Sequence, residues 1–124
     1  MSTRSAIGFV EFDGSVTAIY CHWDGYLESV GQALVKYYND IYKVLDLIEM
    51  GDASSIDATL DTCVFYKRDR NEKITDRDFP NVAEFIGEMS TLGCEFFYLY
   101  DGFEWSWSNG GLNGFKPVPM SVGA

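Results

Sequence analysis

The segment Ile19–Tyr26 concentrates side chains that could recognise a small ligand. It reads Ile-Tyr-Cys-His-Trp-Asp-Gly-Tyr and holds the only histidine of the chain. Residues 17–21 have the pattern of a strand, and apolar residues from Leu27 onward recur at helical spacing. Asp24 is a preferred helix N-cap, and Gly25 allows a sharp turn. The pattern indicates polar and aromatic groups on a rigid strand-to-helix corner, although a capped helix with core aromatics would look the same.

A second candidate segment is basic. Residues 67–77 hold five of the nine basic residues in a chain whose formal charge is −10. This segment could bind a compact anion, or it could be a solvated loop in which acidic residues alternate with the cations. The overall acidity argues against binding duplex nucleic acid through its phosphates, because such binding depends on basic clusters.

Together the two segments supply the components of a nucleotide site. Arg4, Arg68 and Arg70 could hold a phosphate or carboxylate in bidentate fashion. Aromatic rings could stack on a base, Asp24 could accept from ribose hydroxyls, and His22 could donate or accept. The candidate ligand-binding residues are Thr3, Arg4, His22, Trp23, Asp24, Phe65, Tyr66, Arg68, Arg70 and Trp105. The alternative for each is a solvated arginine or a core aromatic.

The patterns for catalysis and for metals are weak. A single histidine and the absence of calcium-loop spacing predict no metal, and we expect no cofactor. Cys21 and His22 resemble a nucleophile and its base, but neighbours in a strand point to opposite faces. We therefore expect no catalytic residues, with Ser2 (after removal of Met1) as a minor alternative nucleophile. The three cysteines lie in apolar runs and are expected to be reduced core residues.

The remaining elements follow from turn residues and periodicity. We expect a hairpin of residues 6–12 and 16–21 around Asp13-Gly14, helices over 26–39 and 41–50, a loop over 51–55 and a strand over 62–66. Residues 78–81 then open a further helix, with Pro80 at its beginning and Gly93 at its end, and a second hairpin of 94–100 and 103–107 follows around Asp101-Gly102. The Gly-, Asn- and Pro-rich tail from about residue 108 is expected to be poorly ordered or to dock on a partner.

These elements predict a single α+β domain over residues 1–124, with an antiparallel sheet built from hairpins and two to three helices packed on one face. The other face would carry surplus aromatics from among Tyr98, Tyr100, Trp105 and Trp107, which predicts a homo-oligomer. No apolar run is long enough to span a membrane, and the first residues lack the apolar region of a signal peptide. We therefore expect a cytoplasmic protein with no membrane partner.

Several motifs resemble a widespread family of small bacteriophage proteins of about this length. They are Met1-Ser2-Thr3-Arg4-Ser5-Ala6-Ile7, the segment Tyr20–Tyr26 followed by Gly31, Gly51-Asp52 with Ser54-Ser55, and Tyr66 followed by Arg68-Asp69-Arg70. One departure is Leu27, where the family is associated with proline. In size, phage distribution and plan of hairpin, helices and sheet, this family is similar to the anti-Thoeris sponge proteins of phages, oligomers that bind cyclic ADP-ribose-type immune signals without cleaving them.

The resemblance implies a phage anti-defence protein that is not an enzyme and that sequesters a host cyclic nucleotide signal between subunits, in the cytoplasm of the infected bacterium. Arg4, Arg68 and Arg70 would then take the pyrophosphate, aromatic rings would stack on the base, and Asp24 would bind ribose. Two other functions stay open. The chain could be a phage host-takeover protein that inhibits a host protein by direct binding, or a small nucleotide hydrolase that uses Ser2 or Cys21.

Overall fold

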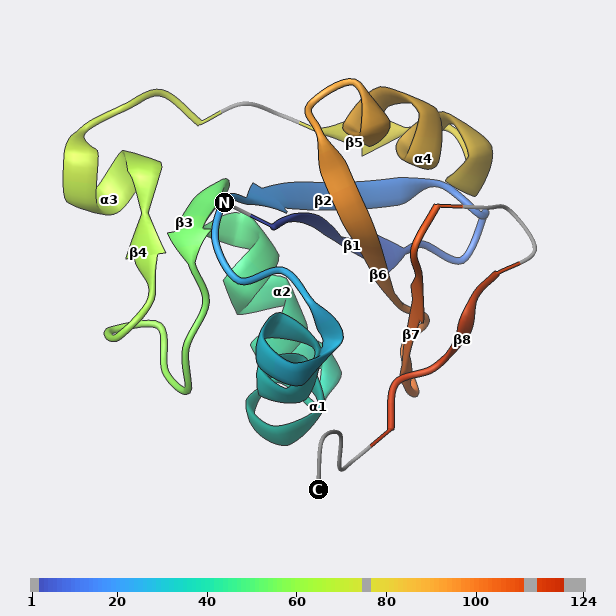
Figure 1. The fold of residues 1–124 in the computed structure, drawn as a ribbon, viewed down its shortest axis with the longest axis horizontal. Helices are drawn as coiled ribbons and strands as arrows, with labels where there is room; N and C mark the ends of the chain where they lie inside the picture. The colour runs from blue at the N-terminus through green and yellow to red at the C-terminus, as the bar shows by residue number, and fades with distance from the viewer. Residues whose placement is uncertain (1–2, 75–76, 111–113, 120–124) are drawn as a thin grey trace.

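A mixed sheet forms the centre of the computed structural model, which describes residues 3–74, 77–110 and 114–119 (Figure 1). Its eight strands are β1 (Arg4–Val10), β2 (Val16–Cys21), β3 (Ala53–Ser55), β4 (Val64–Phe65), β5 (Asp78–Phe79), β6 (Cys94–Tyr100), β7 (Trp105–Ser108) and β8 (Lys116–Pro117). The strand order is β4-β3-β2-β1-β6-β7-β8, and β5 pairs with β2 outside this path. Most pairs are antiparallel, but β1 runs parallel to β6 and β2 parallel to β3.

Both expected hairpins are confirmed. Asp13-Gly14 joins β1 to β2, and Asp101-Gly102 joins β6 to β7, each pair running antiparallel. The glycines of these turns have φ angles of +90° and +100°, a region that only glycine enters without strain. Turn chemistry is local, and for that reason the sequence alone was sufficient to place these two hairpins.

The helices are η1, a π-helical turn (Leu27–Gly31), α1 (Gln32–Tyr37), α2 (Ile41–Glu49), α3 (Tyr66–Arg70) and α4 (Val82–Ser90). Asp40 caps α2 by accepting from the Lys43 amide, and Asn81 caps α4 by accepting from the Glu84 amide. The expected cap at Asp24 is wrong. That residue has a left-handed φ of +56°, and the N-cap position belongs to Tyr26, whose side chain makes no capping bond.

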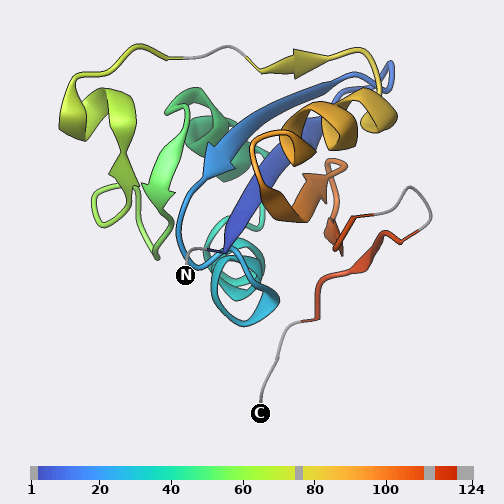
Figure 2. The same cartoon turned by 45° about the horizontal axis from the view of Figure 1, so that its top comes forward.

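The helices cover both faces of the sheet, so the expectation that they pack on one face is wrong although the α+β class is confirmed. Alternate strand residues diverge: Ile7, Phe9, Ile19 and Cys21 pack with α1 and α2, whereas Ala6, Val16, Ala18 and Phe97 pack with Phe85 and Met89 of α4. Figure 2 shows α4 on one side of the β1–β2 pair, with α1 and α2 on the other. The hydrophobic core therefore consists of two clusters, one on each face of the sheet.

The aromatic residues expected on an exposed sheet face are core residues instead. Tyr98, Tyr100 and Trp105 are buried in the cluster that contains α1 and α2, and Trp107 packs against it. The Trp105 indole Nε1 donates to the Tyr38 carbonyl at 2.7 Å, and the Tyr98 hydroxyl donates to the Gly25 carbonyl at 2.7 Å. The homo-oligomer therefore stays a prediction without the support of an exposed aromatic face.

Three smaller expectations also need correction. Part of the tail docks on its own chain: β8 pairs with β7, Val118 is buried, and the Gln32 amide donates to the Pro119 carbonyl. Residues 111–113 and 120–124 lie outside the described residues. Within the expected loop at 51–55 the structure has β3, while the expected strand over 62–66 is shortened to β4 because Tyr66 begins α3. Among the described residues, no helix is long and apolar enough to span a membrane.

Candidate functional site

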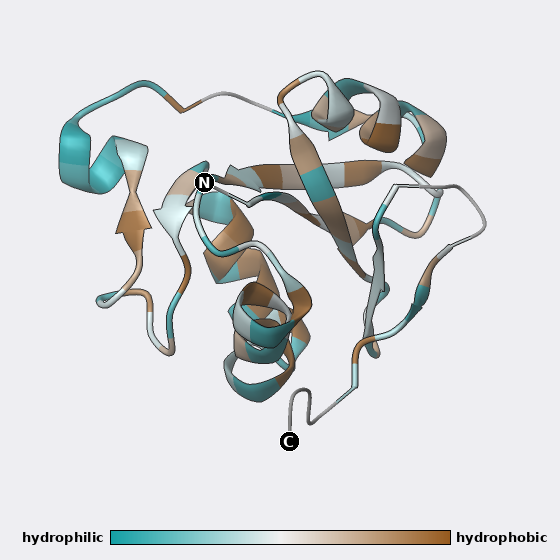
Figure 3. Cartoon of the chain, viewed as in Figure 1, coloured by the Kyte–Doolittle hydropathy of each residue, from teal (hydrophilic) through white to brown (hydrophobic). Residues whose placement is uncertain are grey.

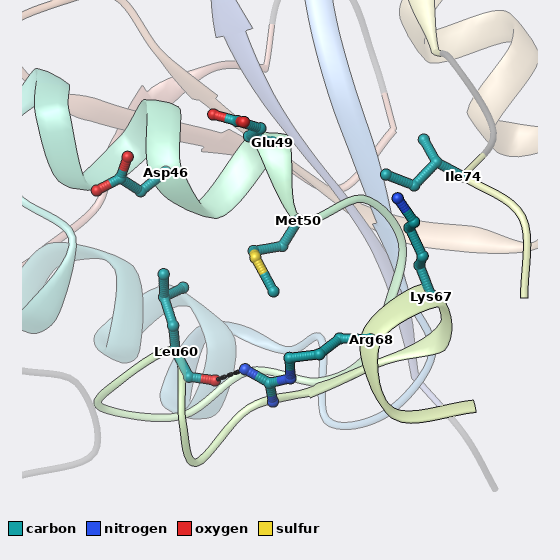
Figure 4. Close-up of a pocket in the computed structure, with 7 residues that line it drawn as sticks. All are labelled: Asp46, Glu49, Met50, Leu60, Lys67, Arg68 and Ile74. Atoms are coloured by element: carbon teal, nitrogen blue, oxygen red, sulfur yellow. Dashed lines mark hydrogen bonds between the residues drawn. The ribbon is translucent and has the colours of Figure 1, made fainter. Parts of the chain in front are cut away.

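A candidate site is a pocket of about 500 Å³ that opens between α2 and α3. Figure 4 shows its lining, which consists of Asp46, Glu49, Met50, Leu60, Lys67, Arg68 and Ile74. The amphipathic pattern of α2 explains one wall, because Val44, Leu47 and Ile48 are buried in the core and leave the acidic side of the helix outside. The opposite wall comes from α3, which is hydrophilic along its length (Figure 3).

The pocket separates opposite charges across an apolar floor. Asp46 and Glu49 are three residues apart on α2, which places both carboxylates on one helix face. Lys67 and Arg68 approach from α3 on the other side, with the Met50 side chain between the two walls (Figure 4). Such a site can receive a ligand that has an anionic end and a donor-rich end.

Arg68 builds the pocket as well as lining it. Its guanidinium donates to the Leu60 and Cys63 carbonyls, both at 2.7 Å, and forms a two-point ion pair with Asp69 at 2.9 Å. The hydrogen bonds that Arg68 donates to Asp69 raise the pKa of Arg68 and lower the pKa of Asp69. The guanidinium also lies 5.1 Å from the centre of the Phe65 ring. These contacts hold the 60–65 segment against α3.

Lys67 is the cation that remains available in this pocket. In the part of the chain that the structure describes, no hydrogen bond or ion pair engages its ammonium group. Because the guanidinium of Arg68 already donates to two carbonyls and to Asp69, an incoming anion would meet Lys67 first. Sequence reasoning named Arg68 and missed Lys67, although both belong to the basic segment.

The strand-to-helix corner at Tyr20–Asp24 forms a separate surface. The Tyr20 hydroxyl lies 2.7 Å from His22 Nδ1, and the His22 ring meets the exposed Trp23 ring edge to face at 4.7 Å. Burial raises the pKa of Tyr20, whereas the nearby charge of Arg4 lowers it. Arg4 itself donates to the Leu92 carbonyl at 3.0 Å. The corner is a polar surface on the side of β2 that faces α4.

Tyr66 and Arg70 extend this second surface. The Arg70 guanidinium lies 5.0 Å from the centre of the Tyr66 ring, a cation–π arrangement. The Tyr66 amide donates to the Asp52 carbonyl and the Tyr20 amide donates to Asp52 Oδ1, so both residues lie beside Asp52. The Tyr66 ring therefore already has a cation on one face, and only its other face could stack on a base.

The structure does not bring the ten predicted ligand residues into one site. Arg68 lies at the α2–α3 pocket, whereas Arg4, His22, Trp23, Tyr66 and Arg70 lie on the Tyr20 side of the sheet. Phe65 and Trp105 are buried in the core, and neither residue lines the α2–α3 pocket. Thr3 contributes its carbonyl, which accepts from the Gly25 amide, and Asp24 is exposed at its left-handed turn.

Sequence reasoning missed most of the pocket. Asp46, Glu49, Met50, Leu60 and Ile74 were not singled out, because each belongs to a type that occurs on any helix or loop. The available signal was the spacing of Asp46 and Glu49, which puts two carboxylates on the polar face of a helix. Which segment faces that helix depends on contacts between distant parts of the chain, and spacing does not reveal them.

The cysteine chemistry considered for this chain has little support in the structure. Cys21 is buried on the α1 and α2 side, while His22 contacts Tyr20 on the other face, as expected for adjacent strand residues. Burial raises the pKa of the Cys21 thiol to about 12, and likewise that of Cys94. A thiol with this pKa is almost entirely protonated near neutral pH and is a poor nucleophile. Ser2 lies outside the described residues.

We expect all three cysteines to resist thiol reagents in the native protein at pH 8 and to react together on unfolding, because all three are buried. The free energy of unfolding should also fall as the pH rises above about 9, since unfolded thiols ionise there while the buried ones do not. Absorbance with a disulfide reagent, with and without denaturant, measures the first effect. Rapid labelling of native Cys21 would contradict it.

Comparisons with known proteins add no relative, since no family model, no curated protein and no solved structure matches the chain. Among the described residues we find no group of three or more His, Cys, Asp or Glu side chains that could hold a metal ion. The argument for function therefore rests on the geometry of the pocket and on the motifs of the sequence.

Proposed function

We propose that this chain binds a nucleotide-type signal in the pocket between α2 and α3 and sequesters it without cleavage. The ligand class is supported by the pocket. The biological role, a phage anti-defence protein that removes a cyclic ADP-ribose-type signal in the cytoplasm of an infected bacterium, is supported by the resemblance of its motifs to small phage proteins. The association of several copies into a homo-oligomer belongs to the same proposal.

The observation that carries the proposal is the distribution of charge in the pocket. A nucleotide has anionic phosphate, which Lys67 can meet, and ribose hydroxyls or base amines, which Asp46 and Glu49 can accept. The apolar side chains of Met50, Leu60 and Ile74 can cover the base. The volume of about 500 Å³ lies within the usual range for small-molecule sites.

Sequestration requires tight binding and slow release, and a preformed site favours both because little ordering is needed on binding. The hydrogen bonds from Arg68 to the Leu60 and Cys63 carbonyls fix one wall of the pocket before any ligand arrives. In the proposed mechanism Arg68 is a positioning residue, Lys67 binds the anion, and the two carboxylates orient the ligand.

The test uses the purified full chain with a panel of cyclic ADP-ribose isomers and cyclic di- and trinucleotides. A ligand at about 100 times its Kd should stabilise the protein by about 2.7 kcal/mol, visible as a raised Tm. Heating the complex should then release the ligand intact. Release of an altered ligand would make the chain an enzyme, and no shift with any member would redirect the proposal to a protein target.

Lys67→Glu should abolish the ligand-induced shift while leaving the Tm of the free protein unchanged, because this exposed side chain makes no hydrogen bond or ion pair with the residues that the structure describes. Lys36→Glu on α1 makes the same charge change away from the pocket lining and should keep the shift. If both variants bind like the parent, the pocket is not the site.

A further inference from the structure

A second cavity, of about 220 Å³, lies where the β6–β7 hairpin meets α1 and the end of the described chain. Its apolar walls come from Val35 of α1, Tyr100 of β6, Trp105 of β7 and Val118 after β8. The volume is below the range typical of sites for small organic ligands. A cavity of this kind suits a single apolar side chain better than a whole nucleotide.

Phe103 stands at the mouth of this cavity and is 90% exposed. The turn that presents it is well ordered by hydrogen bonds, because Asp101 Oδ1 accepts from the Phe103 amide at 2.8 Å and from the Glu104 amide at 2.9 Å. A phenylalanine held in water by a structured turn, beside an apolar cavity, is typical of a protein contact.

A second exposed phenylalanine lies at the same end of the sheet. Because β1 and β6 are parallel, with Phe9 opposite Tyr100, the turns that follow them leave the sheet at one end (Figure 1). Phe12 follows Phe9 by the same three residues that separate Phe103 from Tyr100, and it is fully exposed. The apolar contact surface therefore extends beyond the cavity.

The surroundings of the cavity are acidic. Burial raises the pKa of Tyr100, and the charges of Asp40 and Asp101 raise it further, which places both carboxylates near this wall. Glu104 lines the mouth, and the described lining includes no lysine or arginine. On the neighbouring turn, Glu11 and Asp13 flank Phe12. Carboxylates therefore lie beside the apolar contacts of this region, at Asp40, Asp101 and Glu104.

We propose that this surface binds a basic peptide segment of a partner protein, with one apolar side chain in the cavity and flanking lysine or arginine side chains on the carboxylates. Charge complementarity selects this occupant. A second copy presenting the same acidic end would be repelled, and an anionic membrane surface would be repelled as well. The site is separate from the α2–α3 pocket, so the proposal does not depend on nucleotide binding.

Selection of a random peptide library on the immobilised full chain tests the proposal. We expect enriched peptides with one large apolar residue flanked by lysine or arginine, whose affinity falls as salt is raised. Addition of such a peptide should move the NMR signal of the Trp105 indole, which lines the cavity, and leave that of Trp23 in place. Enriched peptides without basic residues would overturn the proposal.

Two variants and two controls locate the contact. Phe103→Ser and Glu104→Lys should each weaken peptide binding about tenfold or more, as expected for central contacts of an interface. Tyr42→Ser and Glu88→Lys change exposed residues elsewhere and should bind like the parent. Because Phe103 is exposed, its replacement should leave the Tm unchanged, which separates loss of binding from loss of fold.

Unchanged binding by Phe103→Ser would overturn the proposal. So would sedimentation that shows concentration-dependent association of the parent chain and none of Phe103→Ser, since a second copy would then be the occupant of this surface.

Discussion

Phe85→Ala should lower the free energy of unfolding by about 3–5 kcal/mol, the cost of removing a large aromatic side chain from a core. Phe85 is fully buried on α4. Its ring meets the rings of Phe79 and Phe97 edge to face, with centroid distances of 5.7 Å and 6.0 Å. Alanine would leave a cavity between α4 and the sheet, because β5 and β6 hold the surrounding side chains in place.

Gly87→Ala on the same helix is the matched control and should have the opposite effect. A side chain at Gly87 would project into open space, and alanine in a helix interior is favoured over glycine by about 1 kcal/mol. Denaturant unfolding followed by circular dichroism measures both variants. A loss below about 1 kcal/mol for Phe85→Ala would mean that α4 does not cover the second face of the sheet.

Local sequence signals were enough for the hairpins and for one helix start. Asp13-Gly14 and Asp101-Gly102 supply the turn geometry that two antiparallel strands require, and Asp40 caps the helix that follows it. In each of these cases the determining interaction is between residues a few positions apart. Such interactions are visible in a linear sequence.

The parallel pairing of β1 with β6 was not visible, and the helix layers depend on it. Ser5 lies opposite Phe96 in the sheet although they are far apart in the chain. With β6 beside β1, its alternate residues Phe97 and Leu99 face α4 while Tyr98 and Tyr100 face α1 and α2. An apolar residue in a strand predicts burial, but not which helix buries it.

The sequence predicted only part of the candidate site, because the rest depends on contacts between residues far apart in the chain. The basic segment was recognised from its composition, and Arg68 lines the α2–α3 pocket. Phe65, next to that segment, turned out to support Arg68 from the core. Composition indicates which residues are capable of binding an anion. The backbone carbonyls that accept hydrogen bonds from Arg68 become evident only from the folded chain.

Asp52→Ala should lower the free energy of unfolding by about 2–3 kcal/mol, because the Asp52 carboxylate accepts a backbone hydrogen bond at the edge of β2 and pairs with Arg77. That edge pairs with β3 only at Cys21 and with β5 only at Val16 and Thr17. Between these short strands the Tyr20 amide donates to Asp52 Oδ1 at 2.9 Å, so a carboxylate stands where a strand carbonyl would otherwise lie. Alanine would leave this amide unpaired.

The same carboxylate binds Arg77, with Oδ2 2.6 Å from Nη2, and this hydrogen bond raises the pKa of the guanidinium. The expected loss is below the 3–5 kcal/mol of a fully buried pair, because the two side chains remain 19% and 14% exposed. Asp52→Asn keeps an acceptor for the Tyr20 amide and should lose less, which separates the amide bond from the charge. In denaturant unfolding, Arg77→Met combined with Asp52→Asn should lose less than the sum of the single variants. Strict additivity would instead mean that the two side chains stabilise the protein independently of each other.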